Sequence, residues 1–328
     1  MITSKVFRIF ATVAEMSQMP QRRCDCEGGE AVSLFRAHDY ITRDEFQIVQ
    51  CSSCGLAFTQ PVPQSLEWRR YYPDSYYGDP QASRFPRIVE WLQNRLYASR
   101  ARKVERLANG PGRVLDIGCG RGFLLRSFQR RGWDVAGTEM SESAAAYARQ
   151  KLDLPVHVGK FEEVKLPENS FDAVVMWHVL EHFERVDNAL REVNRVLKPG
   201  GIFLVAVPNF GSLEARLARD KWFHLDVPRH LTHFTSGALA RCLVRNRFQV
   251  ETGSVRSLEY DFFSAMQSFL NRIGLRHNWF YNFLRKPFAE RGAAQAFAHL
   301  VCAPIAGVVG CVPLLAGGST LIVYARKL

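Results

Sequence analysis

Three glycines at every second position, directly after a short apolar run, form the motif with the clearest chemistry. They are Gly118, Gly120 and Gly122. The run at residues 114–117 suits a buried parallel strand, and glycines let the backbone turn sharply and a ligand approach it closely. The dinucleotide-binding fingerprint is not met because Phe123 stands where its last glycine would fall, and the Gly-Lys-Ser/Thr of a P-loop is absent. The motif therefore predicts a ligand-binding turn between a strand and a helix.

Two pairs of cysteines near the N-terminus have the arrangement of metal ligands. Cys24 and Cys26 form a CxC pair, and Cys51 and Cys54 form a CxxC pair that a glycine follows. Thiolates in two close pairs suit a structural zinc ion in tetrahedral coordination. The CxC pair and the long spacer depart from the usual spacing. Two alternatives therefore stay open, in which His38 replaces one ligand or the four residues are free buried thiols.

Histidines form a third group of candidate residues. His178, Glu181 and His182 match the HxxEH pattern of some metalloproteases, but we reject that interpretation because the segment here ends a strand. Since an imidazole titrates near neutral pH, either histidine is a candidate general base, and Glu181 and His182 bracing the loop is the alternative. His230 and His233 are rival bases in a later segment, residues 222–235, which we call the histidine-rich segment. This segment forms either a lid over a bound substrate or a loop that only packs on the next helix.

The elements that must position these residues alternate between strand and helix. Apolar runs predict strands over 113–117, 134–138, 156–158, 171–177, 202–207, 248–255 and 319–326. Helical periodicity predicts helices over 84–108, from 123 onward, and over 141–152, 184–197 and 236–247, with Ser141 as an N-cap. This alternation indicates an α/β fold with a mostly parallel sheet and helices on both faces. Glu139 then stands at the carboxyl end of the second strand, where a carboxylate can accept hydrogen bonds from both hydroxyls of a ribose.

Residues 116–122 (DIGCGRG) resemble motif I of the class I S-adenosylmethionine (SAM)-dependent methyltransferases. The resemblance implies a seven-stranded Rossmann-like sheet, with Glu139 as the ribose-binding acid and Asp116 near the cationic methionine end of SAM. Residues 180–182 (LEH) resemble a segment of small-molecule methyltransferases that faces the substrate, and the cysteine module is similar to a ribbon preceding the catalytic domain in bacterial members. The implied cofactor-binding residues are Asp116, Gly118, Cys119, Gly120, Gly122, Glu139, Met140, Phe161, Glu162 and Trp177.

We expect five segments along the chain. They are a tail or short helix (1–23), a Cys-rich zinc-ribbon-like module (24–80), a SAM-binding domain (81–256), an apolar and aromatic insertion (257–316) and the last strand of the sheet (317–328). Residues 296–316 carry no charge and are long enough to span a membrane. Their prolines and glycines, and a last strand that must rejoin the sheet, argue against a single span. A re-entrant or monotopic hairpin and a buried helical pair or dimer interface both remain open.

The charge of the chain indicates an anionic neighbour. The 328 residues carry a net charge of +11, and residues 83–133 hold twelve Arg or Lys against three acidic residues. A membrane surface, a nucleic acid or an acidic substrate would fit this excess, and a solvated helix face is the alternative. The eight cysteines and the absence of a secretory signal indicate a cytoplasmic protein, peripheral on the inner face of the membrane if the apolar segment meets lipid.

The sequence predicts methyl transfer from SAM to an oxygen or carbon atom of a small-molecule, glycan or lipid-linked acceptor. The (N/D)-P-P-(Y/F) motif of enzymes that methylate nucleobase amino groups is missing after the fourth strand. Two alternatives remain: an RNA methyltransferase that uses the ribbon and the basic face, and a scaffold that binds SAM without catalysis. A nucleic-acid partner is the less favoured one, and the oligomeric state is not indicated.

Overall fold

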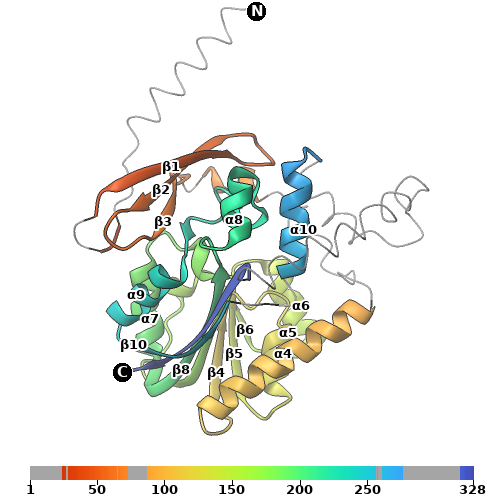
Figure 1. The fold of residues 1–328 in the computed structure, drawn as a ribbon. Coiled ribbons are helices and arrows are strands. Elements are labelled where there is room, and N and C mark those ends of the chain that lie inside the picture. The colour runs from red at the N-terminus through yellow and green to blue at the C-terminus, as the bar shows by residue number, and fades with distance from the viewer. Residues whose placement is uncertain are drawn as a thin grey trace, which may run out of the picture.

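The computed structural model describes residues 24–26, 29–64, 66–72, 87–255, 257, 261–275 and 318–328. Its main body is a seven-stranded sheet with the order β10-β11-β8-β7-β4-β5-β6 (Figure 1). The strands are β4 (Arg113–Ile117), β5 (Asp134–Glu139), β6 (Val156–Val158), β7 (Phe171–Trp177), β8 (Leu197–Pro208), β10 (Phe248–Ser254) and β11 (Thr320–Lys327). Strands β4 to β8 run parallel, and β11 is antiparallel to both of its neighbours, β8 and β10.

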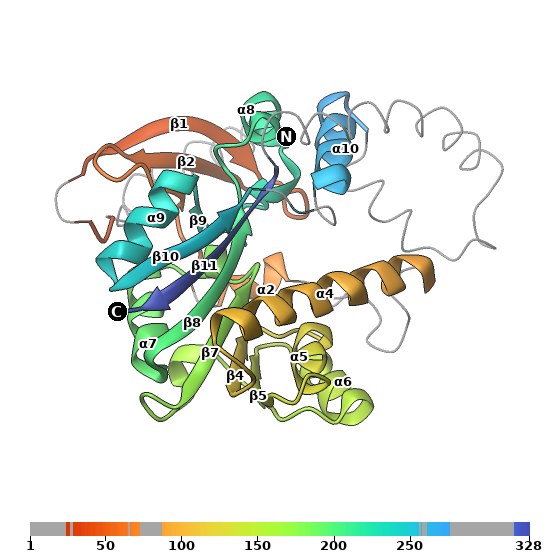
Figure 2. The same ribbon diagram turned by 60° about the horizontal axis from the view of Figure 1, so that its bottom comes forward.

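Helices cover both faces of this sheet (Figure 2). One face carries α4 (Arg87–Leu107), α5 (Phe123–Gln129) and α6 (Glu142–Leu152), and the other carries α7 (Val186–Val196) and α9 (Ser236–Arg245). Side chains alternate between the two cores, as in β4, where Val114 belongs to the first and Leu115 to the second. A parallel strand that is buried on both faces needs apolar residues at successive positions, which explains the continuous apolar runs of the sequence.

A second, smaller sheet lies over the carboxyl ends of the parallel strands (Figure 1). It is antiparallel and has the order β1-β2-β3-β9. Its strands are β1 (Ala31–His38), β2 (Glu45–Cys51), β3 (Ala57–Gln60) and β9 (Thr232–His233), and α2 (Trp68–Tyr71) follows β3. Because β9 comes from the histidine-rich segment, the small sheet is completed by a strand that lies far from β1–β3 in the sequence.

Short helices connect these layers. They are η1 (Phe161–Glu163), η2 (Leu180–His182), α8 (Leu213–Ala218), η3 (Arg219–Lys221), η4 (Phe223–Leu225) and α10 (Asp261–Arg272). The 3-10 helix η2 directly follows β7, and η4 lies in the histidine-rich segment. Among the residues that the structure describes, no helix combines the length and the apolar character needed to cross a membrane.

Most predicted elements are present with ends that differ by a few residues. Ser141 caps α6 as expected, since its side chain accepts a hydrogen bond from the amide of Ala144. The helix predicted over 184–197 instead ends at Val196, because Leu197 already pairs with Phe171 of β7 and so begins β8. The predicted tail 1–23 and the apolar residues 296–316 lie outside the described residues.

Candidate cofactor and acceptor site

The glycine turn after β4 has the conformation that its sequence predicts. Gly118, Gly120 and Gly122 all have positive φ angles, of 65°, 55° and 80°. A Cβ on Gly118 would lie 2.6 Å from Val179, and one on Gly122 would lie 2.5 Å from Leu154. A Cβ on Gly120 would meet nothing within 4 Å. The outer glycines therefore permit close packing, whereas the middle one borders open space from which a ligand can approach the backbone.

Glu139 is held against this turn by two backbone amides. Its Oε2 accepts a hydrogen bond of 2.8 Å from the amide of Gly120, and its Oε1 accepts one of 2.8 Å from the amide of Ser141. Each carboxylate oxygen can accept a second hydrogen bond. The carboxylate is thus oriented in advance and retains acceptor capacity on both oxygens, which is what two ribose hydroxyls require.

Asp116 lies beside Glu139 and is almost completely buried. Burial raises its pKa, and the nearby charge of Glu139 adds to the effect, so that the pKa reaches about 8. A cationic ligand in this place would favour the ionised carboxylate and lower that pKa. This arrangement fits a site for the ammonium or sulfonium group of SAM.

The other predicted cofactor residues differ in accessibility. Cys119 follows Gly118 in the turn and donates its amide to the carbonyl of Thr138, while Met140 is largely exposed next to Glu139. Phe161 is buried in the core, and Glu162 is exposed beside it on η1. Trp177 ends β7, and the guanidinium carbon of Arg100 in α4 lies 3.7 Å from the centre of its ring. Their contact with adenine or methionine therefore stays a prediction.

Three of the four candidate bases lie around Glu181. His178 has a positive φ of 54°, and its Nδ1 lies 3.3 Å from Oε1 of Glu181. Burial alone would raise the pKa of Glu181, but the hydrogen bond from His178 and the charges of the neighbouring histidines outweigh it and lower the pKa to about 2. The rings of His182 and His230 meet edge to face with centroids 4.8 Å apart.

This histidine group adjoins the glycine turn. Val179, between His178 and η2, is the residue that packs against Gly118. His233 lies elsewhere, in β9, where its Nε2 is 2.9 Å from the hydroxyl of Thr59. The structure thus brings His178, His182 and His230 together next to the predicted cofactor site and places His233 in the small sheet.

Sequence reasoning did not find the residues that join the small sheet to the histidine-rich segment. Arg229 is fully buried and forms ion pairs with Asp39 at 2.6 Å and with Asp226 at 2.7 Å. It also donates to the carbonyl of Tyr71. No local pattern in the sequence links Arg229 to Asp39, which lies 190 positions earlier in the chain.

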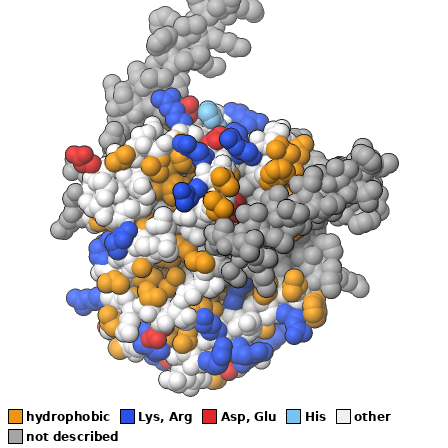
Figure 3. All heavy atoms as spheres, viewed as in Figure 1, with side chains coloured by type: hydrophobic (Ala, Val, Ile, Leu, Met, Phe, Trp, Pro, Cys, Tyr) orange, Lys and Arg blue, Asp and Glu red, His pale blue; other side chains and the backbone are white. Residues whose placement is uncertain are grey.

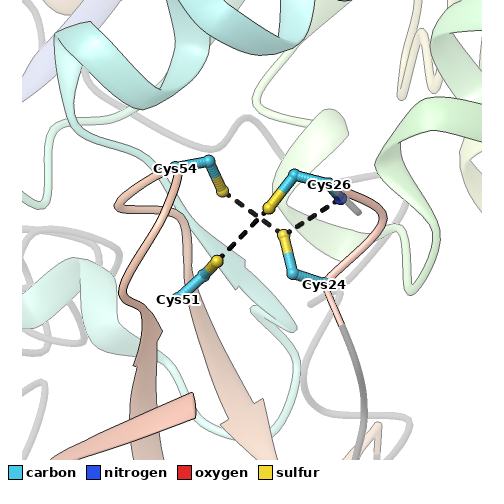
Figure 4. Close-up of side chains that lie close together, drawn as sticks. All are labelled: Cys24, Cys26, Cys51 and Cys54. Carbon is cyan, nitrogen blue, oxygen red and sulfur yellow. Dashed lines mark hydrogen bonds between the residues drawn. The ribbon is translucent and has the colours of Figure 1, made fainter. Parts of the chain in front are cut away.

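The four N-terminal cysteines converge at one end of the small sheet (Figure 4). Cys24 Sγ is 3.3 Å from Cys54 Sγ, Cys26 Sγ is 3.3 Å from Cys51 Sγ, and all four sulfur atoms lie within 4.8 Å of one another. Sulfur atoms around a tetrahedral zinc ion are about 3.8 Å apart, given Zn–S bonds of about 2.3 Å. The donor set and its spacing therefore fit zinc. The alternative ligand, His38, is engaged elsewhere, since its Nε2 lies 3.5 Å from Oε2 of Glu45.

Comparison with known proteins agrees with the geometry. The sequence profile of a methyltransferase-domain family matches residues 89–252, which is half of the chain. The chain belongs to the class I SAM-dependent methyltransferases. Its mostly parallel seven-stranded sheet is the one that the resemblance of residues 116–122 implied.

Two curated relatives and one solved structure illustrate the likeness. The methyltransferase is 30% identical over 172 residues to a malonyl-[acyl-carrier protein] O-methyltransferase of Serratia marcescens, with 51% of this chain and 66% of the relative covered. It is 35% identical over 104 residues to a ubiquinone biosynthesis O-methyltransferase of Alkalilimnicola ehrlichii, with 30% and 42% covered. These matches span about two fifths to two thirds of the relatives. The fold is similar to that of a proposed sarcosine dimethylglycine methyltransferase of Galdieria sulphuraria, with a TM-score of 0.50, 15% identity and 79% and 97% coverage.

Proposed function

We propose that this methyltransferase transfers the methyl group of SAM to an oxygen or carbon atom of a small-molecule, glycan or lipid-linked acceptor. The observation that carries the proposal is the group of His178, Glu181, His182 and His230 beside the glycine turn, joined to it through Val179. Such a group suits an acceptor hydroxyl that must lose a proton. Oxygen is the favoured atom, because the curated relatives named above are O-methyltransferases.

Each part of the site has a role in this reaction. Glu139 orients the ribose, and Asp116 favours the cationic end of SAM over a neutral molecule. The sulfonium is already reactive, so that most of the acceleration comes from alignment with the acceptor and from exclusion of water. A histidine of the group accepts the acceptor proton when the nucleophile is a hydroxyl.

The basic side chains give less support to an RNA substrate than their number suggests. Lys and Arg side chains gather along the lower edge of the face drawn in Figure 3, over α4. Several Lys and Arg side chains between positions 83 and 133 already have partners within the protein. Arg131 forms an ion pair with Glu105, and Arg113 forms one with Asp134. Arg100 is buried against Trp177. RNA methylation is therefore an outcome of the test and not a second proposal.

The test is transfer of labelled methyl from SAM into a cell extract that is then separated into lipid, glycan, small-molecule and RNA fractions. Label in one of the first three fractions supports the proposal and yields a molecule to identify. Label in RNA overturns it. Absence of label, with SAM binding confirmed by calorimetry, contradicts catalysis on any acceptor of that extract and favours a scaffold.

A variant links the result to the site. We expect Glu139→Ala to weaken SAM binding at least tenfold, because the ribose loses a charged acceptor that is worth about 1.5–3 kcal/mol per hydrogen bond. Glu163→Ala, which removes an exposed carboxylate that is not among the predicted cofactor-binding residues, serves as the matched control for general loss of charge. Equal SAM affinity in Glu139→Ala and in the unmodified chain would remove Glu139 from the cofactor site.

We also propose that Cys24, Cys26, Cys51 and Cys54 hold a structural zinc ion, which supplies a covalent-like cross-link in a module too small to fold on its own core. Support comes from the convergence of the four sulfur atoms. Arg241 of α9 donates a hydrogen bond of 2.6 Å to the carbonyl of Cys54 and so holds the CxxC turn in place.

Attachment of residues 296–316 to a membrane surface stays a prediction.

A further inference from the structure

A carboxylate and two imidazoles meet between η2 and the histidine-rich segment. Glu181 and His182 come from η2, and His230 comes from the loop before β9; one ligand atom from each lies within 4.8 Å of the others. Glu181 is 1% exposed and His230 is 8% exposed. This group shares no residue with the cysteine cluster.

The hydrogen bonds of the two rings leave the same nitrogen open on each. Nδ1 of His182 is 2.9 Å from the carbonyl oxygen of Arg229, and Nδ1 of His230 is 2.7 Å from the carbonyl oxygen of His224. A carbonyl only accepts, so that Nδ1 carries the hydrogen in both rings and Nε2 has the lone pair. Histidines that bind metal ions are commonly oriented by such a bond from the opposite nitrogen.

Glu181 offers an oxygen that protein groups do not use. Its Oε1 pairs with His178, whereas its Oε2 is buried and has no hydrogen-bond partner among the described residues. An ionised carboxylate oxygen that is buried without a partner is costly. Two imidazole lone pairs beside it would increase that cost, and a cation between the three groups would remove it.

The backbone around the group is fixed before any ion arrives. The amide of Leu231 donates to the carbonyl of Glu181 at 2.9 Å, and the hydroxyl of Thr59 donates to the carbonyl of His230 at 2.7 Å. The first bond ties the histidine-rich segment to η2, and the second ties it to the small sheet. The three side chains are therefore presented by a rigid frame, as a metal site requires.

We propose that Glu181, His182 and His230 bind one divalent transition-metal ion through the carboxylate and the two Nε2 atoms. Two imidazoles and one carboxylate suit zinc, manganese or ferrous iron and leave coordination positions for water or an acceptor oxygen. While the ion is bound, the Nε2 atoms of His182 and His230 cannot accept a proton, so that His178 is the histidine of the group that acts as the base. The rejection of the HxxEH segment as a protease site stands, because the third ligand is His230 of a distant loop and the sheet is that of a methyltransferase.

The test counts Mn²⁺ ions bound by the full chain. One equivalent of Zn²⁺ first fills the thiolate site, and Mn²⁺ is then titrated while the free ion is measured by electron paramagnetic resonance. We expect one Mn²⁺ per chain, and an affinity at least tenfold weaker in Glu181→Gln and in His182→Gln, since loss even of a supporting hydrogen bond costs 10–100-fold. Circular dichroism shows whether each variant is folded. If Glu181→Gln fails to fold, the Mn²⁺ affinity of His182→Gln still tests the proposal, because His182 is only half-buried.

A control variant keeps the result specific. His157→Gln removes an exposed imidazole on β6 and should bind Mn²⁺ as the unmodified chain does. Failure of the unmodified chain to bind Mn²⁺, or equal affinity in Glu181→Gln and His182→Gln, would overturn the proposal and leave a proton shared by Glu181 and a histidine as the occupant. Because the readout is ion binding, it is independent of methyl transfer.

Discussion

Arg229 in the histidine-rich segment and Asp39 in the loop after β1 form an ion pair of 2.6 Å in which neither side chain is exposed. The two residues are 190 positions apart in the sequence. The same guanidinium also pairs with Asp226 and donates to the carbonyl of Tyr71. This one side chain therefore joins the small sheet to the histidine-rich segment, which carries His230. It also fixes how far that segment lies from the loop after β1.

Arg229→Met should destabilise the protein strongly. Removing one partner of a buried ion pair typically costs about 3–5 kcal/mol, because the remaining charge stays buried without compensation. Here two carboxylates, of Asp39 and Asp226, would be left. Asp39→Asn should cost less, since Arg229 keeps Asp226. Urea unfolding followed by circular dichroism measures both changes.

The exposed pair between Arg36 and Glu45 provides the comparison, since an ion pair of this kind contributes about 0–1 kcal/mol. Arg36→Met should thus leave the free energy of unfolding nearly unchanged. A loss in Arg229→Met as small as that in Arg36→Met would show that the buried pair does not hold the two sheets together.

The sequence predicts those parts of the fold whose conformation is determined by residues close together in the chain. Apolar runs of β-branched residues give strands, glycines at every second position give a left-handed turn, and Glu139 follows its strand at the sheet edge that binds ligands. The cysteine cluster was also predictable, because the CxxC turn is local and its glycine, Gly55, has a positive φ of 69°.

The parts that the sequence does not predict depend on contacts between distant segments. Strand β9 is only two residues long, and it pairs with β3 because the histidine-rich loop is held there by Arg229 and Thr59. Two residues of the histidine-rich segment therefore complete a sheet, a role that its sequence does not predict. The meeting of His230 with Glu181 has the same origin, since a spacing pattern within one segment carries no information on which distant loop approaches it.

Gly118→Ala and Gly120→Ala should have different effects although both residues have positive φ. Alanine in a left-handed conformation costs about 1–2 kcal/mol at either position. At Gly118 the new methyl would also lie 2.6 Å from Val179, so that the loss of stability is larger. At Gly120 the methyl projects into open space, so that stability falls by the smaller amount while SAM affinity falls at least tenfold.

Urea unfolding and calorimetric titration with SAM separate these two effects. The unmodified chain is the reference, and affinity is compared only at temperatures where each variant is folded. SAM affinity in Gly120→Ala equal to that of the reference would mean that the cofactor does not approach the backbone at this glycine.

Asp116→Asn should stabilise the protein without SAM, and increasingly so at higher pH. The pKa of Asp116 is about 8 in the fold, against 3.8 in the unfolded chain, because of burial and of the charge of Glu139. Between these values the folded protein holds a proton that the unfolded chain has released, so that stability falls as pH rises, by about 1.4 kcal/mol per pH unit. Asparagine does not titrate and removes this dependence.

Thermal unfolding from pH 5 to pH 8.5 gives the measurement, with Asp134→Asn, an exposed carboxylate at the start of β5, as the control. The difference in melting temperature between Asp116→Asn and the unmodified chain should widen steadily with pH, and that of Asp134→Asn should not. A difference that stays constant across the range would show that Asp116 is ionised throughout.

Removal of metal from the cysteine cluster should loosen the small sheet. The thiolates of Cys24, Cys26, Cys51 and Cys54 would be released together, and the CxxC turn packs in the same core as α7 and α9. A structural zinc ion contributes binding free energy directly to folding. We therefore expect Cys51→Ser to lower the zinc content by one ion per chain, measured by mass spectrometry, and to lower the melting temperature by at least about 5 °C.

Cys242→Ser tests whether any buried thiol would give the same result. Cys242 is fully buried in α9 but lies outside the cluster, so that its replacement should disturb packing without changing the zinc content. A chelator should then lower the melting temperature of Cys242→Ser and of the unmodified chain, and should have little effect on Cys51→Ser, whose thiolate site is already lost. Equal zinc content in the two cysteine variants would mean that the four thiols pack without a metal ion.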